Sequence, residues 1–565
     1  MTDGRPGDGR PGDGRPWAPV PLVRGTRGAV VAPHHLASTT GLSMLRAGGS
    51  AVDAAIATNA VLGVVMPGSC GIGGDAFWLI WDQASGRQLA LNGSGRAPEA
   101  ASVAAFRSAG HATMPYRGPL SITVPGAVRS WGDAHRRFGR LSRDAILAPA
   151  IELARDGFPA WDGFIRAVEA TATVVASAIG PDTGFHAVFR AYGRPWRPGE
   201  RVRLPALAAT LEALARDGFD AFYDGDLAER QSRALAAAGS PITVADLAAH
   251  RSDWGDPISI DYRGVRVTGH PPNSSAVVAL EILAMLERFA PPPATAFGPD
   301  GVTDPGWIHL GIEASKLAMS DRDGSLTDPA FRDVPVAALL GPDHIGRLVA
   351  RIDPRRAARP APTTNPAGGG TVYLATVDGE GNAVSLIESN YAGFGSGVVD
   401  PDTGIHYQNR GSYFSLDPAH PNVLEPGKRT LHTLLPGMVF RPERPEPWVI
   451  AGSMGGDAQP QVHAQLVSAL VDGGVDVRTA VTAPRWFVEP ATHFAPPVEV
   501  RLEARHRDGI AATLEELGHP VTIAAPFDPT LGQEHAIELV DGGPVGDGSL
   551  TAATDPRSAG LPAAI

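Results

Sequence analysis

The sequence predicts a mixed α+β fold, and three segments carry this prediction. Residues 52–62 are rich in alanine and other compact apolar residues, which is typical of a buried helix. Helical signals interrupted by Gly or Pro dominate from residue 127 to about residue 247. Two runs rich in β-branched residues, 371–377 and 383–389, flank the loop Asp-Gly-Glu-Gly-Asn and predict a β-hairpin.

The other elements follow from the same signals, in chain order. Residues 1–16 carry a Gly-Asp-Gly-Arg-Pro repeat, so we expect a disordered tail over residues 1–24. A Gly-rich loop at 67–75 leads into a strand at 76–81. A dinucleotide-binding turn has the opposite order, strand then loop, so we expect no NAD.

Further signals predict strands within 258–268 and helices at 277–289, 307–319 and 459–470. Residues 355–366, rich in Pro, Ala and Arg, predict an exposed linker that leads to the triglycine 368–370.

The composition limits the kinds of partner. A net charge of −12 over 565 residues disfavours nucleic acid, and no apolar run approaches membrane-spanning length. The single cysteine, Cys70, cannot form an internal disulfide, and we expect a small buried thiol. No secretory signal is visible, so the predicted location is the cytoplasm. The 17 histidines show no ligand spacing such as His-Glu-x-x-His, so we expect neither a metal nor another cofactor.

The predicted hairpin carries a candidate nucleophile. With the loop centred on Glu380, antiparallel pairing sets the Thr371 hydroxyl opposite the Ser389 hydroxyl. Cleavage before Thr371 would free an α-amine on the residue that bears the hydroxyl, and this amine can act as the general base. Taken alone, the segment favours an ordinary hairpin after a glycine-rich loop, because hairpins of this kind are common.

Segments along the whole chain resemble the γ-glutamyltransferase (γ-glutamyltranspeptidase) family. The resemblance extends from about residue 25 to Asp-Pro-Arg at 555–557, and its segments stand in the family's order. They are 47–57, 71–74, 124–128, 153–158, 222–225, 261–264, 313–322, 371–382, 394–397, Gly-Ser-Met-Gly-Gly at 452–456, and Ala-Pro-Arg at 483–485.

The resemblance implies a four-layer αββα sandwich of the N-terminal nucleophile hydrolase type. It also implies a precursor that cuts itself into a large subunit, residues 25–370, and a small subunit, residues 371–565, which stay together as a heterodimer. Thr371 then matches the nucleophile, and Ser389 matches the hydroxyl that hydrogen-bonds it. Gly455 and Gly456 match the glycines whose N–H groups form the oxyanion hole.

The residues that hold the glutamate group in the family have mostly changed. Their positions are occupied here by Ser94, with Arg96 two places later, by Tyr391, with Asn390 beside it, and by Arg410, Tyr413, His432 and Thr433. An acid that would hold the substrate ammonium is replaced by Tyr413, whereas Arg410 offers a guanidinium suited to a carboxylate. For Arg96 we favour a surface position or a structural ion pair.

We therefore expect an acyltransferase or amidohydrolase that opens a γ-glutamyl or related small amide through an acyl-enzyme. One alternative is a hydrolase for a non-glutamyl acidic amide, such as oxamate, or an acylase of the cephalosporin kind. Another is an unprocessed, catalytically silent homologue with a binding role.

Overall fold

The computed structural model describes residues 22–179, 184–190, 193–358, 370–489 and 499–565. Most of the predicted tail, and the predicted linker from residue 359 onward, lie outside these ranges. The tail prediction extends too far, because Val23 and Arg24 belong to strand β1 and pair with Ala552 and Thr551.

Two seven-stranded antiparallel sheets form the centre of the molecule. The first has the order β21 (Ala563–Ala564), β2 (Ala29–Val31), β12 (Gly370–Val377), β13 (Ala383–Tyr391), β3 (Asp75–Asp82), β4 (Arg87–Gly93) and β7 (Asp253–Gly255). The second has the order β1 (Val23–Gly25), β20 (Ser549–Thr554), β19 (Gln533–Val540), β15 (Pro447–Met454), β14 (Pro436–Phe440), β9 (Val265–Gly269) and β8 (Ile258–Tyr262).

Apolar side chains from both sheets meet in a shared core. Phe77, Tyr373 and Ile387 of the first sheet lie in one buried cluster with Met438 and Ile450 of the second. The opposite faces of the same strands contact helices, because successive side chains along a strand point to opposite faces. The architecture is thus the predicted αββα sandwich, with one helical layer on each outer face.

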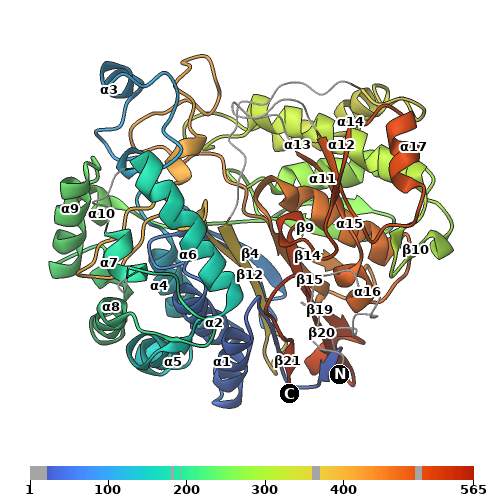
Figure 1. Ribbon diagram of the computed structural model, residues 1–565. Coiled ribbons are helices and arrows are strands. Elements are labelled where there is room, and N and C mark those ends of the chain that lie inside the picture. The colour runs from blue at the N-terminus through green and yellow to red at the C-terminus, as the bar shows by residue number, and fades with distance from the viewer. Residues whose placement is uncertain (1–21, 180–183, 191–192, 359–369, 490–498) are drawn as a thin grey trace, which may run out of the picture.

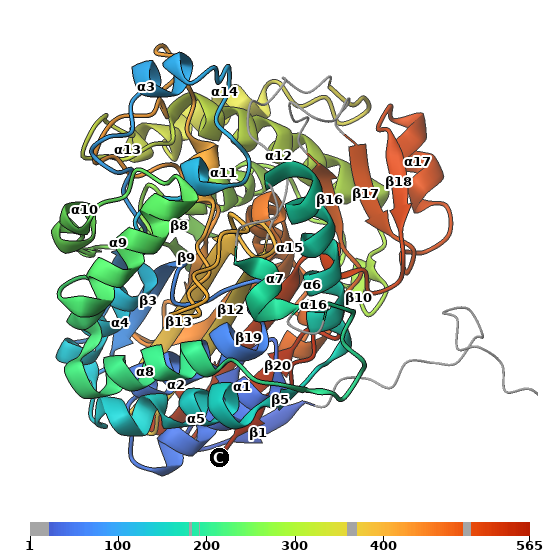
Figure 2. The same ribbon diagram turned by 60° about the vertical axis from the view of Figure 1, so that its left-hand side comes forward.

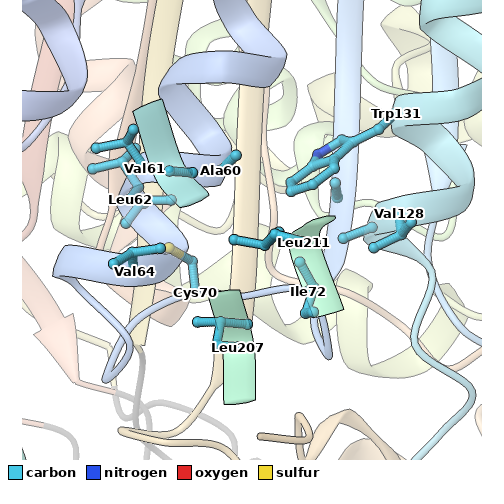
Figure 3. Packing of buried hydrophobic residues seen from close by; sticks show 14 of the residues in the cluster. Ala60, Val61, Leu62, Val64, Cys70, Ile72, Val128, Trp131, Leu207 and Leu211 are labelled. Carbon is cyan, nitrogen blue, oxygen red and sulfur yellow. The ribbon is translucent and has the colours of Figure 1, made fainter. Parts of the chain in front are cut away.

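The first helical layer covers the outer face of the β12–β13 sheet and lies on the left in Figure 1. It comprises α1 (His35–Arg46), α2 (Ala51–Val65), α4 (Ala127–Phe138), α5 (Arg143–Asp156), α6 (Asp162–Val174), α7 (Phe185–Phe189), α8 (Pro205–Asp217), α9 (Asp226–Ala238) and α10 (Val244–Ala249). Every residue of α2 is buried, as its alanine-rich sequence predicts. Figure 3 shows Cys70 among the apolar side chains around α2, so the buried thiol is also confirmed.

The second helical layer covers the other sheet, on the right in Figure 1. It comprises α11 (Ala276–Leu286), α12 (Pro305–Ser325), α13 (Val336–Leu339), α14 (Pro342–Val349), α15 (Gln459–Val471) and α16 (Val477–Thr482). A small sheet of β16 (Trp486–Glu489), β17 (Glu499–Glu503) and β18 (Val521–Ala524) projects beside α17 (Ile510–Glu516), as Figure 2 shows.

Several shorter elements lie in the segments between the larger ones. They are α3 (Val103–Ser108), the strand pair β5 (Phe158–Pro159) and β6 (Arg201–Val202), and the strand pair β10 (Phe297–Gly298) and β11 (Gly301–Val302). In the part of the chain that the structure describes, no helix is long and apolar enough to cross a membrane.

Candidate active site

Thr371 and Ser389 stand opposite each other on β12 and β13, in the register that the hairpin predicts. The Thr371 hydroxyl donates a hydrogen bond to Ser389 Oγ at 3.1 Å. Ser389 in turn donates to the carbonyl oxygen of Gly370 at 2.6 Å. A serine hydroxyl has one proton, so this bond commits the Ser389 proton to the carbonyl of the peptide bond that precedes Thr371.

The strand pairing is irregular at this peptide bond. The register shifts between Gly370 and Thr371, so that Gly370 pairs with Tyr391. A β-carbon at Gly370 would lie 2.8 Å from the carbonyl oxygen of Gly68, which leaves no room for a side chain. A local irregularity of this kind re-aims the groups next to it, and here these are the Thr371 hydroxyl and the Gly370 carbonyl.

A third strand, β3, contributes Asp75 to this site. It begins β3 directly opposite Ser389 and is fully buried. Burial raises the pKa of Asp75 to about 7, although Arg410 and the amides of Gly95 and Gly126 act in the opposite direction. A carboxyl with this pKa changes its charge within the physiological range.

His432 contacts the same carboxyl. Its Nε2 lies 3.3 Å from Asp75 Oδ2. Burial, followed by the charge of Arg410, lowers the pKa of His432 well below its ordinary value, so the imidazole is neutral. Because the Leu434 amide donates to Nδ1, the proton of the neutral ring belongs on Nε2, which donates to Asp75.

Arg410 supplies the positive charge of the site. It lies in the short 3₁₀ turn Arg410–Tyr413 and is 1% exposed. Its Nη2 donates to Ser389 Oγ and its Nη1 donates to Thr433 Oγ1, each at 3.2 Å. Its Nε is buried without a hydrogen-bond partner among the described residues. The side chain is therefore held in place and keeps its Nε donor unused.

Two tyrosines line the guanidinium. The Arg410 guanidinium carbon lies 4.5 Å from the centre of the Tyr391 ring and 5.4 Å from that of Tyr413. Tyr391 has a φ of 72°, which a side chain of this size rarely adopts. Such strain persists where the surroundings hold it, often at functional sites. Here the conformation accompanies stacking of the ring on Arg410.

Gly455 and Gly456 form a tight turn at the end of β15, with φ values of 136° and 58°. Asp457 follows them and accepts a hydrogen bond from the Tyr413 hydroxyl at 3.3 Å. Arg322 of α12 donates to the same Asp457 oxygen. The turn is thereby connected to Arg410 through Tyr413. The other oxygen of Asp457 is buried and accepts no hydrogen bond from the described residues.

Three of the residues predicted to bind substrate make their contacts elsewhere. Ser94 donates to Asn92 Oδ1 at 2.7 Å, in a network that also holds Asn273. Arg96 pairs with Asp253 and Asp328, the structural ion pair that we favoured for it. Asn390 reaches toward the carbonyl of Pro67, because strand alternation turns it away from the face of Ser389. Among the described contacts, no side chain of the three forms a hydrogen bond with the side chain of Thr371, Ser389 or Arg410.

Sequence reasoning did not find Asp75, Asp457 and Arg322 as members of this site. Each stands beside a segment that it did single out: Asp75 follows Gly71–Gly74, Asp457 follows Gly455–Gly456, and Arg322 ends the segment 313–322. The sequence signal that could have found these residues is an acid or a base next to a glycine-rich or helical motif. Only the packing of segments that are distant in the chain shows which of these residues meet.

Two groups of His and carboxylate side chains in the described residues could hold a metal ion. They are His309, Glu313 and His519, and Glu281, Asp321 and His344. Neither group includes a residue of the cluster around Thr371 and Arg410. In that cluster, two hydroxyl groups form a hydrogen-bonded series that ends on the Gly370 carbonyl oxygen.

The αββα sandwich, with a hydroxyl residue at the head of a central strand, defines an amide-cleaving enzyme of the N-terminal nucleophile hydrolase type. A family model described as Gamma-glutamyltranspeptidase matches residues 37–565. The chain therefore belongs to the γ-glutamyltranspeptidase family and is a self-processing amidohydrolase of that family.

Similar proteins differ in the substrates that their names state. The chain is 40% identical to the oxamate amidohydrolase proenzyme of Klebsiella pneumoniae, over 95% of this chain and 98% of that protein. It is 39% identical to the glutathione hydrolase-like YwrD proenzyme of Bacillus subtilis, over 96% of this chain and 99% of that protein. The crystal structure of cephalosporin acylase from Bacillus halodurans superposes with a TM-score of 0.89 at 37% identity, covering 100% of this chain and 99% of that one.

Proposed function

We propose that Thr371 is the nucleophile and that the chain cuts itself between Gly370 and Thr371. The observation that carries this proposal is the hydrogen-bonded series from Thr371 Oγ1 through Ser389 Oγ to the Gly370 carbonyl oxygen. Cleavage there leaves a large fragment that ends at residue 370 and a small fragment of 565 − 370 = 195 residues.

The self-cleavage is an acyl shift followed by hydrolysis. Thr371 Oγ1 attacks the Gly370 carbonyl carbon, and negative charge develops on the carbonyl oxygen, where Ser389 donates its proton in a hydrogen bond. The C–N bond then breaks, the nitrogen takes the proton lost by the hydroxyl, and an ester joins Gly370 to Thr371 Oγ1. Water hydrolyses this ester and leaves a free α-amine and a free hydroxyl on Thr371.

Turnover then uses the same hydroxyl on an external amide. The new α-amine takes the Thr371 hydroxyl proton and passes it to the leaving amine, which gives an acyl-enzyme ester. The N–H groups of the Gly455–Gly456 turn are the proposed donors to the oxyanion, because glycine allows a substrate to approach the backbone closely. Water or an amine releases the acyl group.

We propose that the preferred substrate is a small amide that bears a carboxylate and lacks an α-ammonium group. Arg410 supports this, since its guanidinium is buried beside Ser389 and has an unused Nε donor. Tyr413 stands where the family has an acid for the ammonium. The similarity to oxamate amidohydrolase, whose substrate is an amide next to a carboxylate, agrees with this choice.

A γ-glutamyl amide is the second candidate substrate. The free oxygen of Asp457 is a buried acceptor that an α-ammonium group could use, and a glutathione hydrolase-like protein is among the relatives. Arg322 already pairs with Asp457 and neutralises its charge, which weakens the attraction for an ammonium. Activity on glutathione should therefore be the lesser of the two.

Intact-mass spectrometry tests the self-cleavage. Purified wild-type protein should give two masses, the smaller of which begins at Thr371. Thr371→Ala should remain a single 565-residue chain without amidase activity. A wild-type chain that stays whole in native buffer contradicts the proposal and favours the silent homologue.

A substrate panel tests the specificity. Oxamate, a glutaryl amide, glutathione and an uncharged amide are compared by kcat/KM in the cleaved protein. Arg410→Gln, which restores the family's residue, should raise KM for the acidic amides at least tenfold and leave the uncharged amide within about threefold. Arg96→Ala is the matched control, since it removes an arginine outside the cluster. If glutathione is the best substrate and Arg410→Gln leaves the ranking unchanged, the assignment of Arg410 is wrong.

A further inference from the structure

A compact group of ligating side chains joins three helices of the second layer. It contains Glu281 from α11, Asp321 from α12 and His344 from α14, and their ligating atoms all lie within 4.8 Å of one another. Figure 1 shows the three helices together at the upper right. We propose that these three side chains bind one divalent transition-metal ion, of the Zn²⁺ or Mn²⁺ class.

Glu281 is the main reason to expect a ligand. It is the one polar side chain of α11, whose other residues are Ala, Val, Leu, Ile and Met, and it is fully buried. Neither of its carboxylate oxygens receives a hydrogen bond from an N–H or hydroxyl group of the described residues. A buried carboxylate is costly unless a proton or a cation compensates it. Asp321 of the same group adds negative charge, and its carboxyl group is close enough to share a proton with Glu281.

His344 completes a set of donors with suitable spacing. Its Nε2 lies 2.6 Å from Asp321 Oδ2 and 3.9 Å from Glu281 Oε1. Ligand atoms at the usual zinc bond lengths of about 2.0–2.2 Å stand roughly 3.3–3.6 Å apart in a tetrahedron. The two observed separations lie on either side of that range, so small side-chain rotations suffice. Asp321 and His344 are each about one-fifth exposed, which gives an ion a path from solvent.

A second cluster of similar composition shows what a filled site looks like in this chain. Glu313 lies near His309 and His519, but the Lys316 ammonium occupies a position 2.7 Å from Glu313 Oε1. The other Glu313 oxygen accepts from the amide of Ala358. That cluster already has its cation. Around Glu281, no lysine or arginine of the described residues forms an ion pair with the buried carboxylate.

Metal binding requires a change of tautomer at His344. In the structure Arg347 contacts His344 Nδ1 at 3.3 Å, which leaves the ring proton on Nε2. An ion at Nε2 displaces that proton, Nδ1 becomes the protonated nitrogen, and the exposed Arg347 turns to solvent. Arg347 thus opposes loading, both by its charge and by its hydrogen bond.

The ion would join helices that support the proposed active site. Asp321 precedes Arg322, whose guanidinium pairs with Asp457 beside the Gly455–Gly456 turn. An ion held by α11, α12 and α14 therefore fixes the position of α12 at Asp321, the residue before Arg322. This role is structural, so it stands independently of the proposed substrate.

Titration of chelator-treated full-length protein tests the site. Zn²⁺ and Mn²⁺ are followed separately by calorimetry, and Co²⁺ by its visible absorption. We expect one ion per chain, with affinity at least tenfold lower in Glu281→Gln and in His344→Gln. Arg347→Gln should bind more tightly than wild type. Asp343→Asn is the matched control, since it removes an exposed acid next to His344 and outside the group.

The melting temperature gives a second readout, because an ion that binds only the folded state stabilises it. Zn²⁺ or Mn²⁺ should raise the melting temperature of wild type and not that of Glu281→Gln. If Glu281→Gln does not fold, the partly exposed His344→Gln decides. The proposal is wrong if wild type and both variants bind the ion equally, or if wild type does not bind it. In that case a proton shared between Glu281 and Asp321 compensates the buried carboxylate.

Discussion

At Ser389, one oxygen serves four partners. It accepts from Thr371, from the Tyr391 amide and from Arg410, and it donates to the Gly370 carbonyl. The three donors share the two lone pairs of this oxygen, and its single proton goes to the Gly370 carbonyl oxygen. The hydroxyl is thus oriented toward the carbonyl oxygen before any reaction begins, and such preorganised donors account for much of enzymatic rate enhancement.

Ser389→Ala should slow self-cleavage without unfolding the protein. The ground-state loss for one hydrogen bond is about 0.5–1.5 kcal/mol, but the loss of an oxyanion donor costs about 10²–10³ in rate. We therefore expect at least a tenfold longer half-time of cleavage, measured by gel or mass spectrometry. Ser385→Ala removes a hydroxyl from the same strand, bonded to Tyr373, and should cleave at the wild-type rate. Equal half-times for wild type and Ser389→Ala would show that the hydroxyl is not coupled to the reaction.

Asp75 should give substrate binding a pH dependence near 7. As the pH rises through the Asp75 pKa of about 7, the carboxylate that forms beside Arg410 attracts the guanidinium and competes with an acidic substrate. KM for such a substrate should rise above pH 7 in wild type and stay flat in Asp75→Asn. An identical inflection in both proteins would assign the ionisation to another group.

The same carboxyl should also affect stability, with a definite sign. The pKa of Asp75 is higher in the folded protein than its ordinary value near 4, so folding favours the protonated form. This contribution is full below about pH 4 and is lost as the pH rises through about 7. The free energy of unfolding of wild type should therefore fall relative to that of Asp75→Asn between these values, as measured by denaturant titration.

Among the elements, the hairpin of β12 and β13 shows what a sequence can predict. Its two strands are separated by only five residues, so the loop alone sets Thr371 opposite Ser389. The position of Asp75 could not be found in this way, because β3 joins β13 across some 300 residues of chain. Likewise, Ser94 occupies a family position along the sequence and Asn390 stands beside one, but local turns and strand alternation direct their side chains elsewhere.

The turn at the end of β15 depends on glycine at Gly455. Its φ is 136°, and a β-carbon there would lie 3.0 Å from the Cα of Gly532. Gly455→Ala should cost about 1–3 kcal/mol in backbone strain and lower kcat more than it raises KM, because it moves the proposed oxyanion donors. Gly474→Ala is the control, since Gly474 also has a positive φ but open space around it. If both variants retain the wild-type kcat, the turn does not supply the oxyanion hole.

At the scale of the whole molecule, the proposed cut divides a fold whose halves are interleaved. Strands β13 and β21 and all of β12 after Gly370 come from beyond residue 370, and they share one sheet with β2, β3, β4 and β7 from before it. The other sheet likewise combines β14, β15, β19 and β20 with β1, β8 and β9. The apolar core between the sheets contains residues from both parts.

The two fragments should therefore remain one cooperative unit after cleavage. Separating them would break the strand pairs β2–β12, β3–β13, β9–β14, β1–β20 and β2–β21 and expose the shared core. We expect both fragments to co-elute in size-exclusion chromatography at high salt and high dilution. Wild type and uncleaved Thr371→Ala should each unfold in a single denaturant transition followed by fluorescence and by circular dichroism. If the fragments separate without denaturant, the strand pairs between them are too weak to hold the cleaved protein together. The small subunit would then not be an inseparable part of the sandwich.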